Sequence, residues 1–395
     1  MSQPQDPDRP KSRFYGMRIA LVMLAAALLF GFIQWNRARD LRQQLESARH
    51  PAEAHLTLRG EGLRGGYRLR QLRGPGFYEG DEPSWELIEE SPSDTVNSIH
   101  LPAGIIELTW GEQSWPLLLP RGGKLDIDLT PAPKGFCRVP PGPYLGRLDS
   151  RLSRPLNPEG KTHGPSGYLI SEREVSLADY GEFLRALAVA RNQNDGEAIA
   201  PRDHALEFGP YCSEFERKHF KKGCRGHRPV GGQMDLWAKD IKDGIPDKIL
   251  RFVNYFDALA YCEFLTLREQ NRGRLVRYRL PTQSEWEKAA RGVDGRPFPW
   301  GFSPISAARR GEGDVNLRVS SHAALRSPYG LFHMGSGVSE WTSTPEGRLR
   351  RVVAGVSFDL HRDEIYLGYG LGESPWMRSP ALGFRVVREE RDDAK

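Results

Sequence analysis

Two cysteines and two histidines lie close together in one Lys-rich stretch of the sequence. Cys212, His219, Cys224 and His227 have the spacing C-x6-H-x4-C-x2-H. Thiolate and imidazole groups can close a tetrahedral zinc site, although this spacing matches no standard zinc motif. In an oxidising compartment the same stretch would instead form a disulfide between Cys212 and Cys224. Both alternatives stay open, and the disulfide is preferred.

Other chemistries lack their usual signatures. Within residues 136–390, no G-x-G-x-x-G or P-loop motif follows an expected strand, and no G-x-S-x-G elbow marks a nucleophilic serine. Lys and Arg number 56 against 51 Asp and Glu, which gives a formal net charge of +5. Much of this basic excess flanks an apolar segment near the N-terminus. Nucleic acid is therefore not an expected partner.

The apolar segment is typical of a membrane anchor. An unbroken apolar run covers Ile19–Ile33, with Tyr15 and Trp35 at its two ends. Residues 17–35 are predicted to form a transmembrane signal anchor, after a short cytoplasmic N-terminus of residues 1–16 and before a helical stalk of residues 36–50. A cleaved signal peptide would need small residues after the run, which are missing here. Basic residues are equally frequent on both sides, so charge does not set the orientation.

Residues 51–133 favour β structure. Short runs of alternating apolar and polar residues are separated there by clusters of Gly, Pro, Asp and Ser. This length suffices for a small β-sandwich. A stiff Pro-containing linker then leads to a larger region, residues 136–390.

Three helices in the larger region are predicted from their N-terminal caps. Each pairs a capping side chain with an acidic residue three positions later, as in a capping box. The pairs are Ser176 with Asp179, Asn254 with Asp257, and Thr282 with Glu285. Short strands are expected between long loops, one of them at 330–334. Few helices among irregular strands indicate an α+β fold.

At this point a family resemblance becomes specific. The larger region resembles the sulfatase-modifying-factor family, which includes formylglycine-generating enzymes, ergothioneine-synthesis enzymes and non-catalytic homologues. The matching segments, in order, are Arg279–Gly292, Phe298–Gly301, Ser327–Met334, Ser339–Thr342 and Gly383–Val387. The resemblance implies a compact, loop-rich, C-type-lectin-like α+β domain.

The layout as a whole resembles the outer half of bacterial serine/threonine kinases that carry such a domain outside the membrane. In those proteins a membrane helix precedes a small PEGA-like or prealbumin-like β domain and then the modifying-factor domain. The resemblance implies a single-pass protein of the bacterial inner membrane, with its large domain in the periplasm.

The metal chemistry of the enzymes is not expected here. Formylglycine-generating enzymes bind copper through two cysteines, and the matching positions hold Leu360 and Ile365. No Cys follows Cys262, so copper is not expected. The ten His contain no pair with the spacing of the iron motif in the ergothioneine branch. The resemblance also implies a weakened calcium site at Asp314, Asn316 and Glu340, because Gly337 replaces an Asn ligand.

Because the two copper-binding thiols of the family are missing, the resemblance predicts a catalytically inactive protein with a binding or regulatory role. No cofactor is certain. Candidate ligand-binding residues lie on and beside one loop; they are Ser357, Asp359, His361, Arg362, Trp376 and Arg378. A protein or peptide of an envelope signalling or secretion pathway is the expected partner. Two alternatives stay open: an oxidoreductase-like enzyme with altered metal or substrate chemistry, and a structural partner in an envelope complex.

Overall fold

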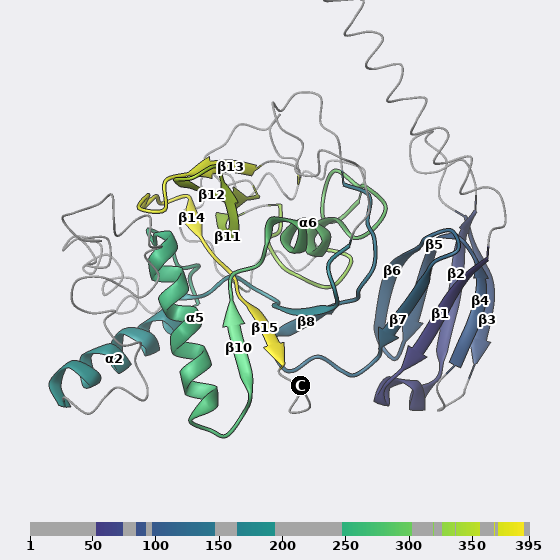
Figure 1. Cartoon of the computed structure of the whole chain (residues 1–395), viewed down its shortest axis with the longest axis horizontal. Coiled ribbons are helices and arrows are strands. Elements are labelled where there is room, and N and C mark those ends of the chain that lie inside the picture. Colours follow the sequence, from purple (N-terminus) through teal and green to yellow (C-terminus); the bar gives the residue numbers. More distant parts are fainter. Residues whose placement is uncertain are drawn as a thin grey trace, which may run out of the picture.

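The computed structural model describes residues 53–73, 84–91, 97–146, 164–193, 247–301, 319, 326–335, 337–355, 367 and 370–390. Within these ranges, no helix is both long and apolar enough to cross a membrane. The predicted N-terminus, anchor and stalk, residues 1–50, lie outside the described residues. Figure 1 shows two units, a group of strands from the N-terminal part and a larger mixed unit from the rest of the chain.

The N-terminal unit contains two β-sheets that share a core. One sheet has the order β4 (Asn97–Pro102), β1 (Glu53–Arg59) and β7 (Lys124–Asp128), with β1 and β7 parallel. The other has the order β3 (Ser84–Ser91), β2 (Tyr67–Arg73), β5 (Gly104–Trp110) and β6 (Gln113–Leu119), all antiparallel. A short 3-10 helix, η1 (Glu61–Gly65), joins β1 to β2. Alternate residues such as Leu56 and Leu108 are buried, which confirms the predicted β structure.

The larger unit mixes helices with two further sheets. The first sheet has the order β10 (Val276–Arg279), β15 (Val387–Glu390), β9 (Tyr168–Ser171) and β8 (Phe136–Val139). The second has the order β13 (Gly370–Glu373), β12 (Arg350–Ala354), β11 (Ser339–Glu346) and β14 (Leu382–Gly383). The helices among the described residues of this unit are α2 (Leu177–Gln193), α5 (Tyr255–Gln270) and α6 (Gln283–Arg291). This arrangement confirms the predicted α+β class.

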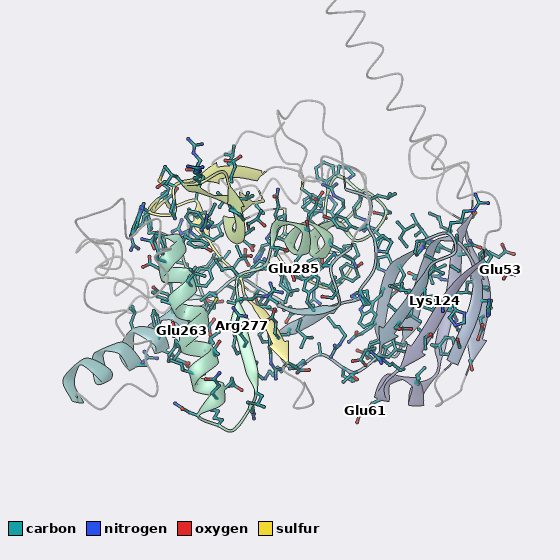
Figure 2. All side chains as sticks on the ribbon, in the orientation of Figure 1. Glu53, Glu61, Lys124, Glu263, Arg277 and Glu285 are labelled. Atoms are coloured by element: carbon teal, nitrogen blue, oxygen red, sulfur yellow. The ribbon has the colours of Figure 1, made fainter. Side chains whose placement is uncertain are left out.

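All three predicted helix starts are confirmed by hydrogen bonds. The Asn254 side chain accepts from the Asp257 backbone N–H, and the Asp257 carboxylate accepts from the Asn254 N–H, both at 2.9 Å. Thr282 and Glu285 make the same exchange at the start of α6, and Ser176 and Asp179 make it before α2. These bonds satisfy backbone donors that the first helical turn leaves free. Figure 2 shows Glu285 at this end of α6.

The strand predicted at 330–334 is wrong. These residues form turns, and His333 has a positive φ of 58°. The apolar side chains of Leu331, Phe332 and Met334 are all buried, because the segment folds back into the core instead of extending along a sheet. A run of apolar residues predicted the burial correctly and the backbone conformation incorrectly.

The two units pack against each other. One buried cluster contains Leu125 of β7, Trp286 of α6 and Tyr329 of a nearby turn. The Tyr329 hydroxyl donates to the carbonyl oxygen of Pro116 in β6 at 3.2 Å. The larger unit therefore shares its core with the β unit at this contact.

Candidate functional site

The larger unit contains a buried network of charged side chains. Glu174 lies just before α2, Glu340 lies in β11, and Arg385 lies between β14 and β15. His333 joins them from the turn-forming segment, and Trp286 joins them from α6. All five side chains are almost completely inaccessible to solvent. Buried charges of this kind must be paired or hydrogen-bonded, so their partners decide what the site can do.

Arg385 and Glu340 form the centre of the network. The Arg385 Nε donates to Glu340 Oε2 and its Nη2 donates to Glu340 Oε1, both at 2.7 Å. The Trp286 Nε1 donates to the same Oε2 at 2.8 Å. Both oxygens of Glu340 are thus occupied by donors of the protein itself. This bidentate geometry is the strongest that a guanidinium and a carboxylate can form.

Glu174 lies at the edge of the network. The His333 Nδ1 is 3.0 Å from Glu174 Oε2, and the Arg385 Nη2 is 3.7 Å from the same oxygen. Its second oxygen, Oε1, is buried and has no hydrogen-bond partner among the described residues. A Cβ at Gly337 would come within 3.2 Å of Oε1. Because Gly337 has no side chain, it avoids this close contact with Glu174 Oε1.

The two carboxyl groups have pKa values shifted in opposite directions. Burial by itself raises the pKa of Glu174, but the charges of His333 and Arg385 and the His333 hydrogen bond outweigh it and lower the pKa overall. For Glu340, burial dominates and raises the pKa, in spite of the Arg385 charge. Burial lowers the pKa of Arg385, yet the neighbouring Glu340 and Glu174 raise it overall. Glu174 is therefore an ionised carboxylate, and its Oε1 accepts no hydrogen bond from the described residues.

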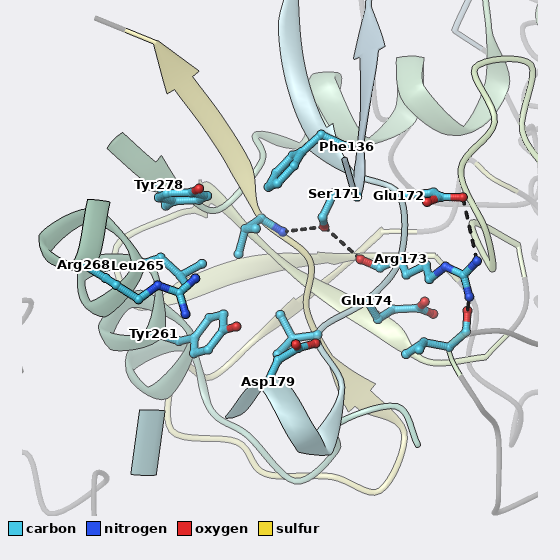
Figure 3. Close-up of a pocket in the computed structure, with 14 residues that line it drawn as sticks. Phe136, Ser171, Glu172, Arg173, Glu174, Asp179, Tyr261, Leu265, Arg268 and Tyr278 are labelled. Carbon is cyan, nitrogen blue, oxygen red and sulfur yellow. Dashed lines mark hydrogen bonds and ion pairs between the residues drawn. The ribbon is translucent and has the colours of Figure 1, made fainter. Parts of the chain in front are cut away.

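A cavity of about 290 Å³ adjoins Glu174. Figure 3 shows its lining, with Glu174 and Arg173 on one side and Arg268, Leu265 and Tyr278 on the other. Strand β9, helix α5 and strand β10 all contribute residues. The Ser171 hydroxyl donates to the Arg173 carbonyl at 2.8 Å and accepts from the Val386 N–H at 3.1 Å. The cavity thus combines charged groups with aromatic and aliphatic walls, as small-molecule sites do.

Trp376 and Arg378, two of the predicted ligand-binding residues, lie away from this cavity. The Arg378 Nη2 donates to Asp257 Oδ1 and its Nη1 to the Phe252 carbonyl, both at 3.1 Å. The Trp376 ring packs on Phe256, with 4.3 Å between ring centroids. Both side chains therefore contact the first turn of α5. The other four predicted residues, Ser357, Asp359, His361 and Arg362, lie outside the described residues, so the ligand-binding loop stays a prediction.

The calcium prediction is also untested. Asp314 and Asn316 lie outside the described residues, whereas the oxygens of Glu340 accept hydrogen bonds from Arg385 and Trp286. In the part of the chain that the structure describes, no group of three His, Cys, Asp or Glu side chains is placed to hold a metal ion.

Two cysteines are described, and both are free thiols. Burial and the charge of Glu172 raise the pKa of Cys137 to about 12. Burial also raises the pKa of Cys262 well above its ordinary value. Such thiols stay protonated near neutral pH and are poor nucleophiles and metal ligands. Cys212 and Cys224 lie outside the described residues, so their disulfide and zinc alternatives stay predictions.

Sequence reasoning missed the cavity and the pairing of Glu174 with His333. The two residues are 159 positions apart in the chain. Nothing in the local sequence of Glu174 or of His333 links the two residues. The one usable signal was His333, a polar residue among the apolar residues Leu331, Phe332 and Met334.

Comparisons with known proteins agree with the fold. The family model described as sulfatase-modifying factor enzyme 1-like domain matches residues 128–390. The mouse protein named inactive C-alpha-formylglycine-generating enzyme 2 is 32% identical over 301 residues, which cover 69% of this chain and 90% of that protein. Hercynine oxygenase of Mycolicibacterium smegmatis is 37% identical over 226 residues, covering 52% of this chain and 45% of that protein. Mouse formylglycine-generating enzyme is 22% identical over 301 residues, covering 64% of this chain and 74% of that protein.

Proposed function

The chain belongs to the sulfatase-modifying factor enzyme 1-like domain family, and we propose that it is a binding or regulatory member without the copper chemistry of formylglycine-generating enzymes. In this proposal the larger unit is an extracytoplasmic module, held at a bacterial inner membrane by residues 17–35. Its ligand is a protein or peptide, recognised by the loop that carries Ser357, Asp359, His361 and Arg362.

The observation that carries this proposal is the lack of a thiol pair. No Cys follows Cys262 in the sequence, and the positions that match the copper ligands hold Leu360 and Ile365. Aliphatic side chains offer no lone pair to a metal ion, whereas Cu(I) prefers soft thiolate ligands. The two described thiols, Cys137 and Cys262, have raised pKa values and do not replace them.

Two further findings support a binding role. The mouse relative with 32% identity is named an inactive enzyme, and the match covers 90% of its length. In addition, the buried network of Arg385 and Glu340 and the capped helices of the larger unit are intact. A scaffold that keeps its packing while it lacks the metal ligands is suited to present a surface for binding.

The similarity to hercynine oxygenase favours a second candidate, an oxidoreductase-like enzyme with different metal ligands. This relative is 37% identical over 226 residues, although the chain spans only 45% of its length. Asp359, His361 and Asp363 are the residues that would supply oxygen and nitrogen ligands in that case. Metal analysis of the purified protein separates the two candidates, because only the enzyme would hold stoichiometric iron, copper or zinc outside the Cys212–His227 stretch.

An oxygen-consumption assay tests the proposal directly. The purified protein is reconstituted with Cu(I) and given a sulfatase-derived Cys peptide, with mouse formylglycine-generating enzyme as the positive control. We expect no oxygen uptake and no aldehyde product above the background of copper alone. Copper-dependent turnover of the peptide would overturn the proposal.

A further inference from the structure

We propose that the cavity beside Tyr261 binds one uncharged sugar unit, whose hydroxyl groups bond the Tyr261 hydroxyl, Asp179 Oδ1 and Arg268 Nη2. The inference assigns a ligand class to a cavity that the proposed function does not use. It does not depend on the membrane anchor, on the loop with Ser357 or on the absence of copper chemistry, so each proposal can fail without the other.

The Tyr261 side chain forms part of the cavity wall and offers an unpartnered hydroxyl. Only 5% of the residue is exposed, and its ring lies 5.8 and 5.9 Å from those of Tyr180 and Phe183, between centroids. The hydroxyl makes no hydrogen bond to the described residues, but it is not sealed as Glu174 Oε1 and Arg268 Nε are. Figure 3 shows it directed toward the space that the lining residues enclose. A ligand hydroxyl there would supply its missing partner.

Asp179 and Arg268 lie near this hydroxyl and offer one open acceptor and one open donor. Their charges act on it: burial and Asp179 raise the pKa of Tyr261, and Arg268 lowers it. Asp179 Oδ2 accepts from the backbone N–H and the hydroxyl of Ser176, whereas Oδ1 accepts from none of the described residues. Arg268 Nη1 donates to Glu182 Oε2 at 3.2 Å, whereas Nη2 donates to none of them. Asp179 is exposed, as is 32% of the Arg268 side chain, so a ligand can reach both.

The charges around the cavity favour an uncharged ligand. Glu172 and Arg173 lie 3.8 Å apart on one side, and Asp179 and Arg268 carry opposite charges on the other. Glu174 is already paired within the buried network. The capping bonds of Asp179 and the ion pair of Arg268 compensate part of each charge. A charged ligand would therefore lose its hydration for a partner that is already partly neutralised.

Hydroxyl groups match the open atoms of the cavity. A carboxylate oxygen such as Asp179 Oδ1 only accepts, and a guanidinium nitrogen such as Arg268 Nη2 only donates. Each hydroxyl of a sugar both donates and accepts, so several hydroxyls on one ring can serve both atoms and Tyr261 as well. A simple alcohol has one such group and leaves other atoms unpaired. An amide also has a donor and an acceptor, and it is therefore the rival ligand in the test.

The remaining walls suit the C–H face of a sugar ring. Phe136, Leu265 and Tyr278 line the cavity with aromatic and aliphatic surface (Figure 3). A volume of about 290 Å³ accommodates a single sugar unit. Covering this apolar surface adds binding energy without further polar contacts.

Titration calorimetry on the purified full chain, kept in mild detergent, tests this inference. The probes are the methyl glycosides of D-glucose, D-galactose and D-mannose, together with N-acetyl-D-glucosamine. The comparison ligands are D-glucosamine, D-glucuronate, cyclohexylmethanol and N-acetyl-L-phenylalaninamide, which are cationic, anionic, poor in hydroxyls and an amide. We expect saturable binding of at least one probe, and at least tenfold weaker binding of every comparison ligand. The inference is overturned if no probe saturates at 10 mM, or if a comparison ligand binds within tenfold of the best probe.

Tyr261→Phe assigns the first contact, because it removes the hydroxyl and keeps the packed ring. Since this hydroxyl has no partner among the described residues, the variant should unfold at no lower temperature than the parent protein. It should bind the best probe at least about threefold more weakly, which corresponds to one net hydrogen bond. The matched control is Tyr168→Phe, whose hydroxyl donates to the Glu285 carbonyl oxygen and does not line the cavity. The control should lose stability and keep binding. Unchanged binding by Tyr261→Phe would contradict the proposed pose.

Arg268→Gln tests the second contact at the partly exposed side of the cavity. We expect the best probe to bind at least about threefold more weakly, because Nη2 is removed. The control is Arg277→Gln, because Arg277 is exposed on the neighbouring strand β10 and does not line the cavity (Figure 2). It should bind the probe as the parent protein does. Equal binding by the two variants would contradict the contact with Arg268.

Discussion

Arg385 balances the charges of two buried carboxylates in the core of the larger unit. It makes a bidentate ion pair with Glu340 and lies 3.7 Å from Glu174, and all three side chains are fully buried. Such a network is not by itself evidence of high stability, because burying the charges is costly. Its members nevertheless depend on one another. Removing one partner leaves another charge uncompensated in a medium of low polarity.

Arg385→Met should therefore lower the free energy of unfolding strongly. We expect a loss of about 3–5 kcal/mol, the range for breaking one side of a buried ion pair. Chemical denaturation followed by tryptophan fluorescence measures it. Arg277→Met, at an exposed position, is the control and should change stability by less than about 0.5 kcal/mol. A loss below about 1 kcal/mol for Arg385→Met would show that the network is not coupled as described.

Lys288 makes stability depend on pH. Its side chain is 1% exposed, and its Nζ donates to the carbonyl oxygens of Pro140 and Gly142 at 2.6 and 2.7 Å. Burial lowers the pKa of this lysine from an ordinary value of 10.5 to about 7. Between these two pH values the unfolded chain holds a proton that the folded chain has lost. The contribution of Lys288 to stability therefore rises with pH in this interval and is constant below it.

Lys288→Met should remove this rise. We expect the stability difference between the parent protein and the variant to shift in favour of the parent by up to about 1.4 kcal/mol per pH unit above pH 7. Urea denaturation at pH 6, 7, 8 and 9 gives the slope. The slope is informative even if the substitution lowers stability at every pH by removing two hydrogen bonds. A parallel pH dependence in both proteins would mean that Lys288 keeps its proton when folded.

Among the elements, α6 shows how much a local sequence signal can determine. Thr282 and Glu285 form the predicted capping box, and Gly292 ends the helix with a φ of 76°. The cap fixes the start of the helix, and this start directs Trp286 toward Glu340. By contrast, the apolar pattern of the segment at 330–334 did not distinguish a strand from a buried turn.

Thr282→Ala should reduce stability by about 1 kcal/mol, because the Glu285 backbone N–H loses its acceptor at the helix start. Thermal unfolding followed by circular dichroism measures the change. Gln283→Ala is the matched control, since it keeps both bonds of the capping box. Equal effects of the two substitutions would indicate that the cap contributes nothing beyond ordinary helix propensity.

At the scale of the whole molecule, the β unit and the larger unit share a buried cluster. The Tyr329 hydroxyl reaches the Pro116 carbonyl, and a Cβ at Gly292 would lie 3.4 Å from Pro116. Within the larger unit, Lys288 holds the segment that follows β8 through the carbonyl oxygens of Pro140 and Gly142. These contacts predict that the two units unfold together, although each has its own sheets.

Tyr329→Ala should uncouple them. We expect one calorimetric transition for the parent protein and two for the variant, because the shared cluster loses a buried ring and a hydrogen bond to β6. Tyr329→Phe is the control; it loses only the hydroxyl and should keep a single transition. Two transitions in the parent protein would contradict the shared core.

The sequence by itself determined the features that depend on neighbouring residues. The helix caps, the alternating strands of the β unit, the ordered family segments and the lack of thiols at Leu360 and Ile365 could all be read directly. Capping bonds join residues three positions apart, so their geometry follows from local sequence.

The tertiary structure alone decided which distant groups meet. It paired Glu174 with His333 across 159 positions and Glu340 with Arg385 across 45. It also left Glu174 Oε1 buried with no hydrogen-bond partner among the described residues. Such contacts depend on how the elements pack, because the free energy of burying each group depends on all its neighbours at once. A local sequence pattern does not contain the information about these distant neighbours.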